Sequence, residues 1–225
     1  MELSNRELRR FENQIKLPGI GLEGQIKLKN SKVAIVGAGG IGTNVLMHLV
    51  TSGIGTLGII DNSIIEESNL HRQVLYGSSD LGKQKAIVAK QKLQEINPQT
   101  IINIHNLLIS ASNAYSVCDI YDLVIDTTNS AETFENIFSF CYSGNKPLIF
   151  ARIKEFIIEI AVITNFKEFQ QPDYKNNTDK NGFVSSVSGI AGSMISLEAI
   201  KLISGLKSSI NNRLLKFNAL DLSII

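Results

Sequence analysis

The segment KVAIVGAGGIG, residues 32–42, decides the fold. Its first half is a short apolar run at 33–36 with the length and composition of a buried strand. Its second half has the spacing G-x-G-x-x-G and carries Gly37, Gly39, Gly40 and Gly42. The apolar pattern at 41–52 predicts a helix directly after this turn. A strand, a glycine turn and a helix in this order indicate a nucleotide site, because glycines let the backbone approach a phosphate and the helix N-terminus offers unpaired N–H groups.

Further strands and helices alternate on the C-terminal side of this segment. The runs TLGIID, TIINIH, YDLVID and KPLIFA read as buried strands. Helical patterns lie between them at 83–96 and 132–142, and Pro98 follows the first of these. This alternation predicts an α/β fold whose mostly parallel sheet is covered by helices on both faces.

The ends of the chain differ in character from this alternating part. Residues 1–25 read as an amphipathic N-terminal arm that closes with Pro18-Gly19. The run FIIEIAVIT predicts a longer strand, and residues 165–182 are polar, which predicts a flexible lid or crossover loop. A helix rich in small residues then ends at Gly205, and the tail LLKFNALDLSII adds one or two strands. We therefore expect one domain over 1–225 with a partly antiparallel C-terminal extension.

The composition excludes several functional classes. Of the 225 residues, 44% are hydrophobic and 19% are charged, and the formal net charge is +1. This balance, without basic runs, predicts no nucleic-acid partner and no membrane-surface binding, and no segment reads as the about 20 apolar residues of a membrane span. Cys118 and Cys141 alone make no disulfide framework, so a cytoplasmic protein with both thiols buried is expected.

A second group of residues separates the possible nucleotides. Asp61 ends the strand that follows the glycine turn, where a carboxylate holds ribose hydroxyls in NAD-dependent and ATP-dependent proteins alike. The segment SNLHRQ, residues 68–73, then brings Arg72 with the amides of Asn69 and Gln73, and Lys85 lies on the first turns of the next helical pattern. Arg and Lys neutralise the charge of a reacting phosphate, so this set favours ATP over NAD.

These linked motifs resemble the ThiF/MoeB/HesA family, relatives of the ubiquitin-activating enzymes. The resemblance runs from RFENQIKLPGIGLEGQIKLKN through SGIGTLGIIDNSIIEESNLHRQVLYGSSDLGKQKA and YDLVIDTTNS, and it resumes in GIAGSMISLEAIKLISG. It implies a Rossmann-like, usually homodimeric enzyme that binds ATP and Mg²⁺. In such enzymes a substrate carboxylate attacks the α-phosphate and pyrophosphate leaves. The substrate is often the Gly-Gly tail of a ubiquitin-like sulfur carrier.

The resemblance also assigns roles to residues of this chain. It implies that Arg72 and Lys85 are catalytic and hold the phosphates. The positions that match the nucleotide-binding set are Gly37, Gly39, Gly40, Gly42, Asp61, Asn69, Arg72, Gln73, Lys85 and Asn129.

The chain departs from the family at two positions that act with these groups. The family's arm reads R-[YF]-x-R-Q, and its second Arg enters the partner's site, whereas residues 10–14 read RFENQ and place Asn13 there. Arg9 or Arg10 is a candidate substitute. The family's D-x-T-D-N carries a Mg²⁺-holding Asp where this chain has Asn129, which lacks the charge that Mg²⁺ favours. Asp126 is then a candidate Mg²⁺ ligand through a water, or a strand-end acid with a structural partner.

Two further departures concern zinc and the substrate. Many members bind zinc through two C-x-x-C pairs, which this chain lacks, so we expect no zinc. After KPL the family has small residues that admit a thin Gly-Gly tail, whereas this chain has Phe150 and Arg152, which predict a narrower passage. Arg152 and Lys154 are candidate contacts for an anionic small molecule, or they face solvent.

The sequence thus predicts ATP-dependent adenylation of a carboxylate, with a small-molecule acid such as a cofactor precursor, or a peptide, as the substrate. Two alternatives remain open at this point. One is a catalytically degenerate ATP-binding subunit that acts with a partner, and the other is activation of a sulfur-carrier Gly-Gly tail.

Overall fold

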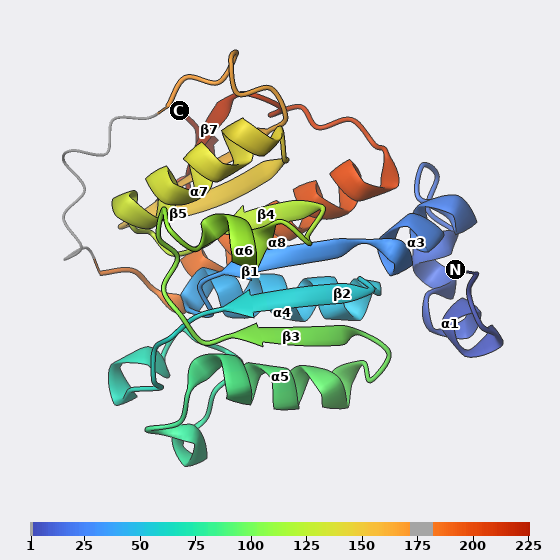
Figure 1. Ribbon diagram of the computed structural model, residues 1–225, viewed down its shortest axis with the longest axis horizontal. Helices are drawn as coiled ribbons and strands as arrows, with labels where there is room; N and C mark the ends of the chain where they lie inside the picture. Colours follow the sequence, from blue (N-terminus) through green and yellow to red (C-terminus); the bar gives the residue numbers. More distant parts are fainter. Residues whose placement is uncertain (1, 172–181) are drawn as a thin grey trace.

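A computed structural model describes residues 2–171 and 182–225 of the chain (Figure 1). Within these residues one sheet has eight strands in the order β3-β2-β1-β4-β5-β6-β7-β8. The strands are β1 Lys32–Val36, β2 Thr56–Ile60, β3 Ile101–His105, β4 Leu123–Asp126, β5 Leu148–Lys154, β6 Ile157–Ile163, β7 Leu214–Asn218 and β8 Ser223–Ile224. The first five strands in chain order pair in parallel, and β6, β7 and β8 pair antiparallel. The predicted mixed sheet is confirmed.

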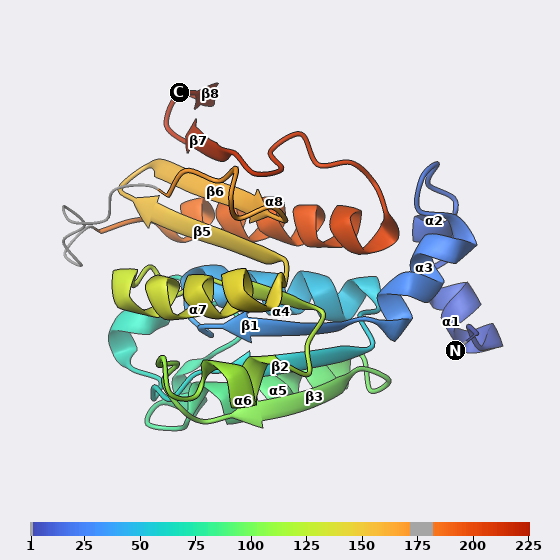
Figure 2. The same ribbon diagram turned by 45° about the horizontal axis from the view of Figure 1, so that its top comes forward.

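Helices cover both faces of this sheet (Figure 2). They are α1 Asn5–Arg10, α2 Glu12–Ile15, α3 Gly21–Asn30, α4 Gly40–Ser52, α5 Lys85–Ile96, α6 Ala114–Cys118, α7 Ala131–Gly144 and α8 Ser185–Ser204. Apolar residues of α4, α5 and α8 form one core with the sheet, and those of α6 and α7 form a second core on the other face. Because side chains alternate along a strand, Val33 and Ile35 enter the first core while Ala34 and Val36 enter the second.

The helices α4 and α8 approach closely beneath the sheet. A Cβ added at Gly192 of α8 would lie 2.5 Å from the Cβ of Asn44 on α4, so only glycine permits this spacing. By length and composition α8 is also apolar enough to span a membrane, which the sequence pattern did not suggest to us. Its contacts with α4 and β5 make it a core helix of this domain.

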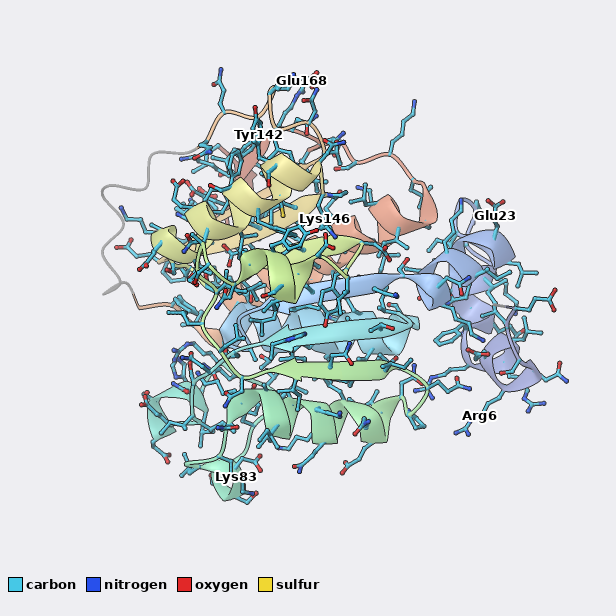
Figure 3. All side chains as sticks on the ribbon, viewed as in Figure 1. Arg6, Glu23, Lys83, Tyr142, Lys146 and Glu168 are labelled. Atoms are coloured by element: carbon cyan, nitrogen blue, oxygen red, sulfur yellow. The ribbon has the colours of Figure 1, made fainter. Side chains whose placement is uncertain are left out.

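The N-terminal arm forms helices α1 and α2 at the end of the sheet where the parallel strands begin, and α3 leads from it into β1 (Figure 1). Arg6 and Glu23 project outward from this end (Figure 3). The arm is tied to its own chain, because Lys29 forms a 2.8 Å ion pair with the buried Glu7 and the Arg10 guanidinium donates to the carbonyl of Ile96. Asn13 lies exposed on α2. Arg10 is therefore already engaged, far from the strand ends at which a nucleotide would bind.

The segment predicted as a loop at 165–182 is described only at its two ends. Residues 172–181 lie outside the described part, so the lid prediction stays untested there. Phe166 and Phe169 are buried against Phe138 of α7, with ring centroids 5.1 and 6.4 Å away. The first part of the segment is thus anchored to the second core, which its polar composition did not predict.

Candidate functional site

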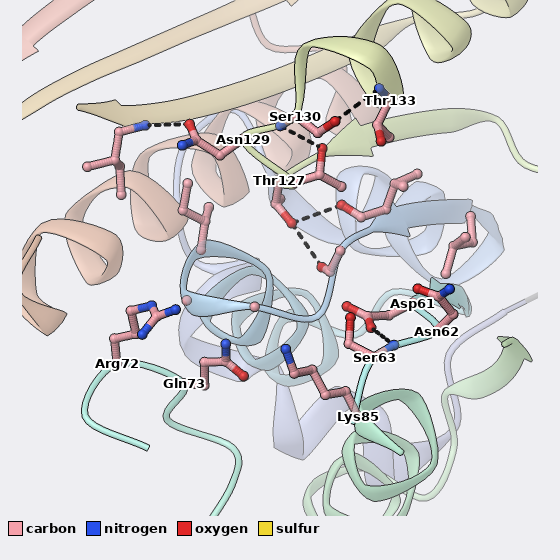
Figure 4. Close-up of a pocket in the computed structure, with 18 of the residues that line it drawn as sticks. Asp61, Asn62, Ser63, Arg72, Gln73, Lys85, Thr127, Asn129, Ser130 and Thr133 are labelled. Carbon is pink, nitrogen blue, oxygen red and sulfur yellow. Dashed lines mark hydrogen bonds between the residues drawn. The ribbon is translucent and has the colours of Figure 1, made fainter. Parts of the chain in front are cut away.

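A cavity of about 640 Å³ opens at the carboxyl ends of the parallel strands, beside β1, β2 and β4 (Figure 4). From β1 the chain runs outward to β2 and β3 on one side, whereas β4 and β5 lie on the other. The strand order therefore reverses beside β1, and ligands of open α/β sheets bind at such a point. The structure thus places the glycine turn, which follows β1, at the centre of this cavity.

Gly37 and Gly42 are the positions of the glycine turn that do not tolerate a side chain. Gly37 has φ +94°, a left-handed conformation that favours glycine. A Cβ at Gly42 would lie 2.0 Å from the carbonyl oxygen of Gly37 and 2.8 Å from the hydroxyl of Thr127. That hydroxyl lies 3.0 and 2.9 Å from the carbonyl oxygens of Val36 and Gly37, to which it donates. Gly37, Gly39 and Gly40 line the cavity, and Gly42 fixes the turn from behind.

Asp61 connects the end of β2 to this turn. One carboxylate oxygen accepts from the Ala38 N–H at 2.7 Å, and the other accepts from the Ser63 N–H at 2.7 Å. The carboxylate is partly exposed to the cavity, and each oxygen keeps a further lone pair. Asp61 can therefore orient the glycine turn and accept hydrogen bonds from a ligand's hydroxyls at the same time.

Three residues of the loop at 68–73 line the cavity: His71, Arg72 and Gln73. The Arg72 Nη1 donates to the Ser68 carbonyl at 2.6 Å, and its stem lies 3.4 Å from the position of a Cβ at Gly40. The side chain of Gln73 is almost fully buried, and within the described residues its Oε1 has no hydrogen-bond donor. Gln73 therefore has an acceptor that a ligand or a water must satisfy. Figure 4 shows the side chains of Arg72 and Gln73 along one side of the glycine turn, with Lys85 beside them.

Lys85 is the first residue of α5, and its side chain is only 8% exposed. Burial lowers the pKa of its ammonium below the ordinary value of 10.5, while the carboxylate of Asp61 acts to raise it. The hydroxyl of Tyr76 donates to the carbonyl oxygens of Ala38 and Lys85, at 2.9 and 3.3 Å. This buried tyrosine, which the sequence reasoning missed, joins the glycine turn to the start of α5.

The opposite wall follows β4 and carries mainly hydroxyl and amide groups. Thr127, Thr128, Ser130 and Thr133 line the cavity there. Asn129 has φ +59°, a conformation that Asn tolerates better than most residues, and its Oδ1 accepts from the Ile153 N–H at 3.3 Å. That bond ties the loop after β4 to β5.

Five predicted site residues do not line the cavity: Gly42, Asn69, Asp126, Arg152 and Lys154. Asn69 is buried beneath the loop, where its carbonyl accepts from the N–H groups of Arg72 and Gln73. Asp126 is 3% exposed and one of its oxygens accepts from the N–H and the hydroxyl of Thr128, so it has the structural partner that the sequence left as one alternative. Burial raises the pKa of its carboxyl.

The predicted narrowing of the substrate passage by β5 is wrong. Phe150 and Arg152 point into the second core, where the guanidinium of Arg152 lies 5.0 Å from the ring centroid of Phe134 on α7. Arg152 therefore does not face solvent. Side chains alternate along β5, so Ile153 is the residue that lines the cavity, and Lys154 is exposed beyond it.

The cavity also has an apolar wall that the motifs did not predict. Ile60 and residues 107–109, Leu-Leu-Ile, supply it, and Phe183 joins from the segment before α8. The only sequence signal for the Leu-Leu-Ile stretch is its place just after β3, a parallel strand that ends at the same edge. An apolar wall beside Asp61 fits a base attached to a ribose.

The polar groups that line the cavity fit a nucleoside triphosphate, but they do not provide the carboxylate ligands with which a protein binds Mg²⁺. Of the described residues that line it, Asp61 alone is acidic, and both its oxygens already accept backbone N–H groups. Mg²⁺ prefers carboxylate oxygens, and Asp126 is buried under Thr128. Across 2–171 and 182–225, no three His, Cys, Asp or Glu side chains form a metal-binding cluster. The absence of zinc stays a prediction.

Several known proteins are similar to this chain. A probable molybdopterin-synthase adenylyltransferase of Porphyra purpurea is 38% identical and matches 98% of this chain, which spans 60% of that protein's length. A sulfur carrier protein adenylyltransferase of Thermus thermophilus is 32% identical over 99% of this chain and 88% of that protein.

The fold has a solved counterpart in E. coli MccB, whose structure with ATP superposes with a TM-score of 0.82. That match has 26% identity and covers 99% of this chain and 71% of the MccB chain. Residues 11–224 match the ThiF family, as the glycine turn and the loop at 68–73 suggested. This chain therefore belongs to the ThiF family.

Proposed function

We propose that this chain binds ATP in the cavity and transfers AMP to the carboxylate of a substrate. The observation that carries the proposal is a pair of cations beside the N-terminus of α4, formed by Arg72 and Lys85. Within the described residues neither cation forms an ion pair, and Asp61 and Glu66 act on Lys85 only as nearby charges that raise its pKa. A site that places two cations at a helix N-terminus without a directly paired carboxylate suits a polyphosphate.

The remaining walls of the cavity fit a nucleotide whose phosphates lie beside Arg72 and Lys85. Asp61 would accept hydrogen bonds from the ribose hydroxyls, and the apolar wall formed by Ile60 and residues 107–109 would take the adenine. The N–H groups of the glycine turn would then face the phosphates. The relatives of this chain are named adenylyltransferases, and one solved neighbour was determined with ATP, which supports this choice of nucleotide.

The reaction that follows is a displacement at the α-phosphorus. An oxygen of the substrate carboxylate forms a bond to phosphorus, the bond to the bridging oxygen breaks, and pyrophosphate leaves with that electron pair. Negative charge grows on the phosphate oxygens as the bonds change, and fixed cations stabilise it without reorganisation. Arg72 and Lys85 line the cavity and would supply these cations.

The positions of Phe150 and Arg152 support a carboxyl-terminal tail as the substrate. The preference for a small-molecule acid rested on Phe150 and Arg152, which lie on the far side of β5. Ile153 lines the cavity instead. With that objection removed, the name of the Thermus thermophilus relative supports the C-terminal carboxylate of a carrier protein as the substrate.

Isotope exchange between ATP and pyrophosphate tests this function directly. The purified chain is incubated with labelled pyrophosphate, ATP and one carboxylate at a time, including a carrier protein or peptide ending in Gly-Gly and a series of small acids. Exchange that needs one of these carboxylates supports adenylation. ATP binding by calorimetry without exchange for any acid supports the degenerate subunit instead. A chain that binds no ATP contradicts both.

Asn129 gives a specific reason to keep the degenerate subunit as a second candidate, because among the described residues that line the cavity only Asp61 carries a carboxylate for Mg²⁺. We expect Asn129→Asp to fold, since the new carboxylate can still accept from the Ile153 N–H. It adds negative charge near the phosphates, so ATP affinity should fall in EDTA and recover with Mg²⁺, whereas the natural chain changes little. Calorimetry with and without Mg²⁺ measures this.

Asn145→Asp is the matched control, because Asn145 also has a positive φ of 46° but is exposed at the end of α7. The prediction would be contradicted if the ATP affinity of the natural chain depended on Mg²⁺ as strongly as that of Asn129→Asp. A large gain in exchange rate for Asn129→Asp would indicate that the natural site is catalytically weakened.

Replacing Lys85 by Met should stabilise the free protein and weaken ATP binding. Burial lowers the pKa of Lys85 in the folded chain below its unfolded value near 10.5. Between these two pKa values the unfolded chain binds more protons than the folded chain, so the free energy of unfolding rises with pH. At pH 7 the buried charge costs stability, and Met removes that cost. ATP affinity should fall about tenfold or more, because hydrogen bonds to charged groups contribute about 1.5–3 kcal/mol.

Urea unfolding at pH 7 and at pH 9–10, with and without ATP, measures both effects of Lys85→Met. The free energy of unfolding of Lys85→Met should depend less on pH than that of the natural chain, because the titration of Lys85 is removed. Lys83→Met is the control, because Lys83 is exposed two residues earlier (Figure 3). A Lys85→Met protein that is less stable than the natural chain without ATP would contradict the assignment.

We also propose a homodimer in the cytoplasm. Asn13 is exposed on α2. The arm lies at the end of the sheet opposite the chain's own cavity (Figure 1), so an arm residue would reach a nucleotide site only in a second copy. Arg9 remains the candidate cation there, because Arg10 is held by the Ile96 carbonyl. Both cysteines are free and buried, and burial raises their thiol pKa values, which suits a packing role in a reducing compartment.

A further inference from the structure

The side chain of Arg72 is held by three contacts. Its Nη1 donates to the Ser68 carbonyl at 2.6 Å, four residues back in the same loop. Its Cγ and Cδ lie 3.4 Å from the position that a Cβ at Gly40 would occupy, so the stem rests on the glycine turn. Its Cζ lies 5.5 Å from the ring centroid of Phe183, within the range of a cation–π contact.

Phe183 comes from a distant part of the chain and is fixed by the core. It precedes Val184, the N-cap of α8, and its half-buried ring packs against the first core while also lining the cavity. The long helix α8 packs along α4, whose first turn carries Gly40. The ring is thereby anchored to the same helix pair that supports the glycine turn.

An aromatic ring holds a guanidinium differently from a carboxylate. A carboxylate would orient Arg72 but would also neutralise it and occupy its N–H groups, in competition with a phosphate. The face of an aromatic ring attracts the cation and leaves the N–H groups at its edge free to bind. Nη1 uses one of five N–H donors on Ser68, so the others remain for a ligand.

We propose that Phe183 is a positioning residue for Arg72, which it holds toward the glycine turn while leaving its charge uncompensated. This inference rests on the proposed function only in that Arg72 binds the phosphates of ATP. An arginine with four rotatable bonds loses considerable entropy when a ligand orders it. The ring and the Ser68 carbonyl restrict those rotations before the nucleotide arrives, so binding costs less.

The test compares ATP affinity among substitutions at Phe183, measured by calorimetry with ATP alone. Phe183→Leu keeps an apolar side chain but removes the ring, and we expect it to weaken ATP binding about fivefold, the effect of one modest cation–π contact. Phe183→Tyr keeps the ring face and should remain within about twofold of the natural chain. Val184→Ala, next in the chain and exposed, is the control for a local disturbance of α8.

A double-mutant cycle shows whether Phe183 acts through Arg72. In an Arg72→Gln background the cation is absent, so Phe183→Leu should cause no further loss. Additive losses would overturn the proposal and indicate direct contact with the nucleotide. Equal losses for Phe183→Leu and Phe183→Tyr, or no loss for Phe183→Leu, would also overturn it.

ATP affinity is measured without a carboxylate substrate, so the result separates the two proposals. Absence of pyrophosphate exchange with intact ATP binding overturns the adenylation function alone. Absence of ATP binding overturns both.

Discussion

Arg72→Ala should abolish nearly all carboxylate-dependent exchange of pyrophosphate into ATP. Removal of one group that stabilises transition-state charge in a closed site lowers the rate by about 10²–10³-fold. Arg72 lines the cavity and forms no ion pair among the described residues, so its charge is available for the phosphates. ATP binding should fall less than the rate, because charge on the phosphate oxygens grows during the reaction. Exchange kinetics over a range of ATP concentrations separate the two effects.

Two further variants show whether the arginine itself matters. Arg72→Lys keeps the charge but loses the planar fork and should recover only part of the rate. Arg213→Ala removes an exposed arginine near β7, away from the nucleotide cavity, and should leave exchange unchanged. Normal exchange by Arg72→Ala would contradict the assignment of the catalytic charge to this residue.

Gly42→Ala should destabilise the fold and prevent ATP binding. The new Cβ would lie 2.0 Å from the carbonyl oxygen of Gly37, which is backbone, and 2.8 Å from the Thr127 hydroxyl. The glycine turn must therefore move, although Gly42 itself does not line the cavity. Overpacking in a tight interior costs about 1–3 kcal/mol, and a displaced turn would no longer direct its N–H groups at a phosphate. Urea unfolding and ATP calorimetry measure the two losses.

Gly144→Ala is the matched control for this substitution. Gly144 is the last residue of α7, and a Cβ there meets no atom within 4 Å. Alanine favours a helix over glycine by about 1 kcal/mol in a helix interior, so this variant should be at least as stable as the natural chain. A Gly42→Ala protein that binds ATP normally would show that the turn tolerates a side chain.

The side of the cavity that carries the glycine turn was predictable from the sequence because its residues are close in the chain. The glycine turn, Asp61, Arg72, Gln73 and Lys85 follow one another between the end of β1 and the start of α5, and local strand and helix signals place them at one edge of the sheet. Parallel strands put their carboxyl ends together, so the order of residues is enough to bring these groups near one another.

The orientation of side chains on β5 was not predictable in the same way. The strand is buried on both faces, so LIFARIK has no alternation of polar and apolar residues from which to read its register. A shift of one residue would exchange Arg152 with Ile153 at the cavity. Only pairing with β4 and β6, and packing against α7, places Arg152 away from the site.

The side-chain positions of Asp126 and Phe183 were likewise not predictable from the sequence. Asp126 ends β4 beside the cavity, yet the Thr128 hydroxyl and N–H hold its carboxylate inward, and no strand pattern predicts that bond. Phe183 follows a polar stretch and reaches Arg72 only because α8 packs on α4.

The order of residues alone predicted the α/β fold, the glycine turn and the cations of the nucleotide cavity, because these depend on local periodicity and on motifs contiguous in the chain. Folding alone determined which face of β5 meets the cavity, which acid is buried, and which aromatic ring orients Arg72. These depend on contacts between segments far apart in the sequence, and such contacts form only when the sheet and its two helical layers pack together.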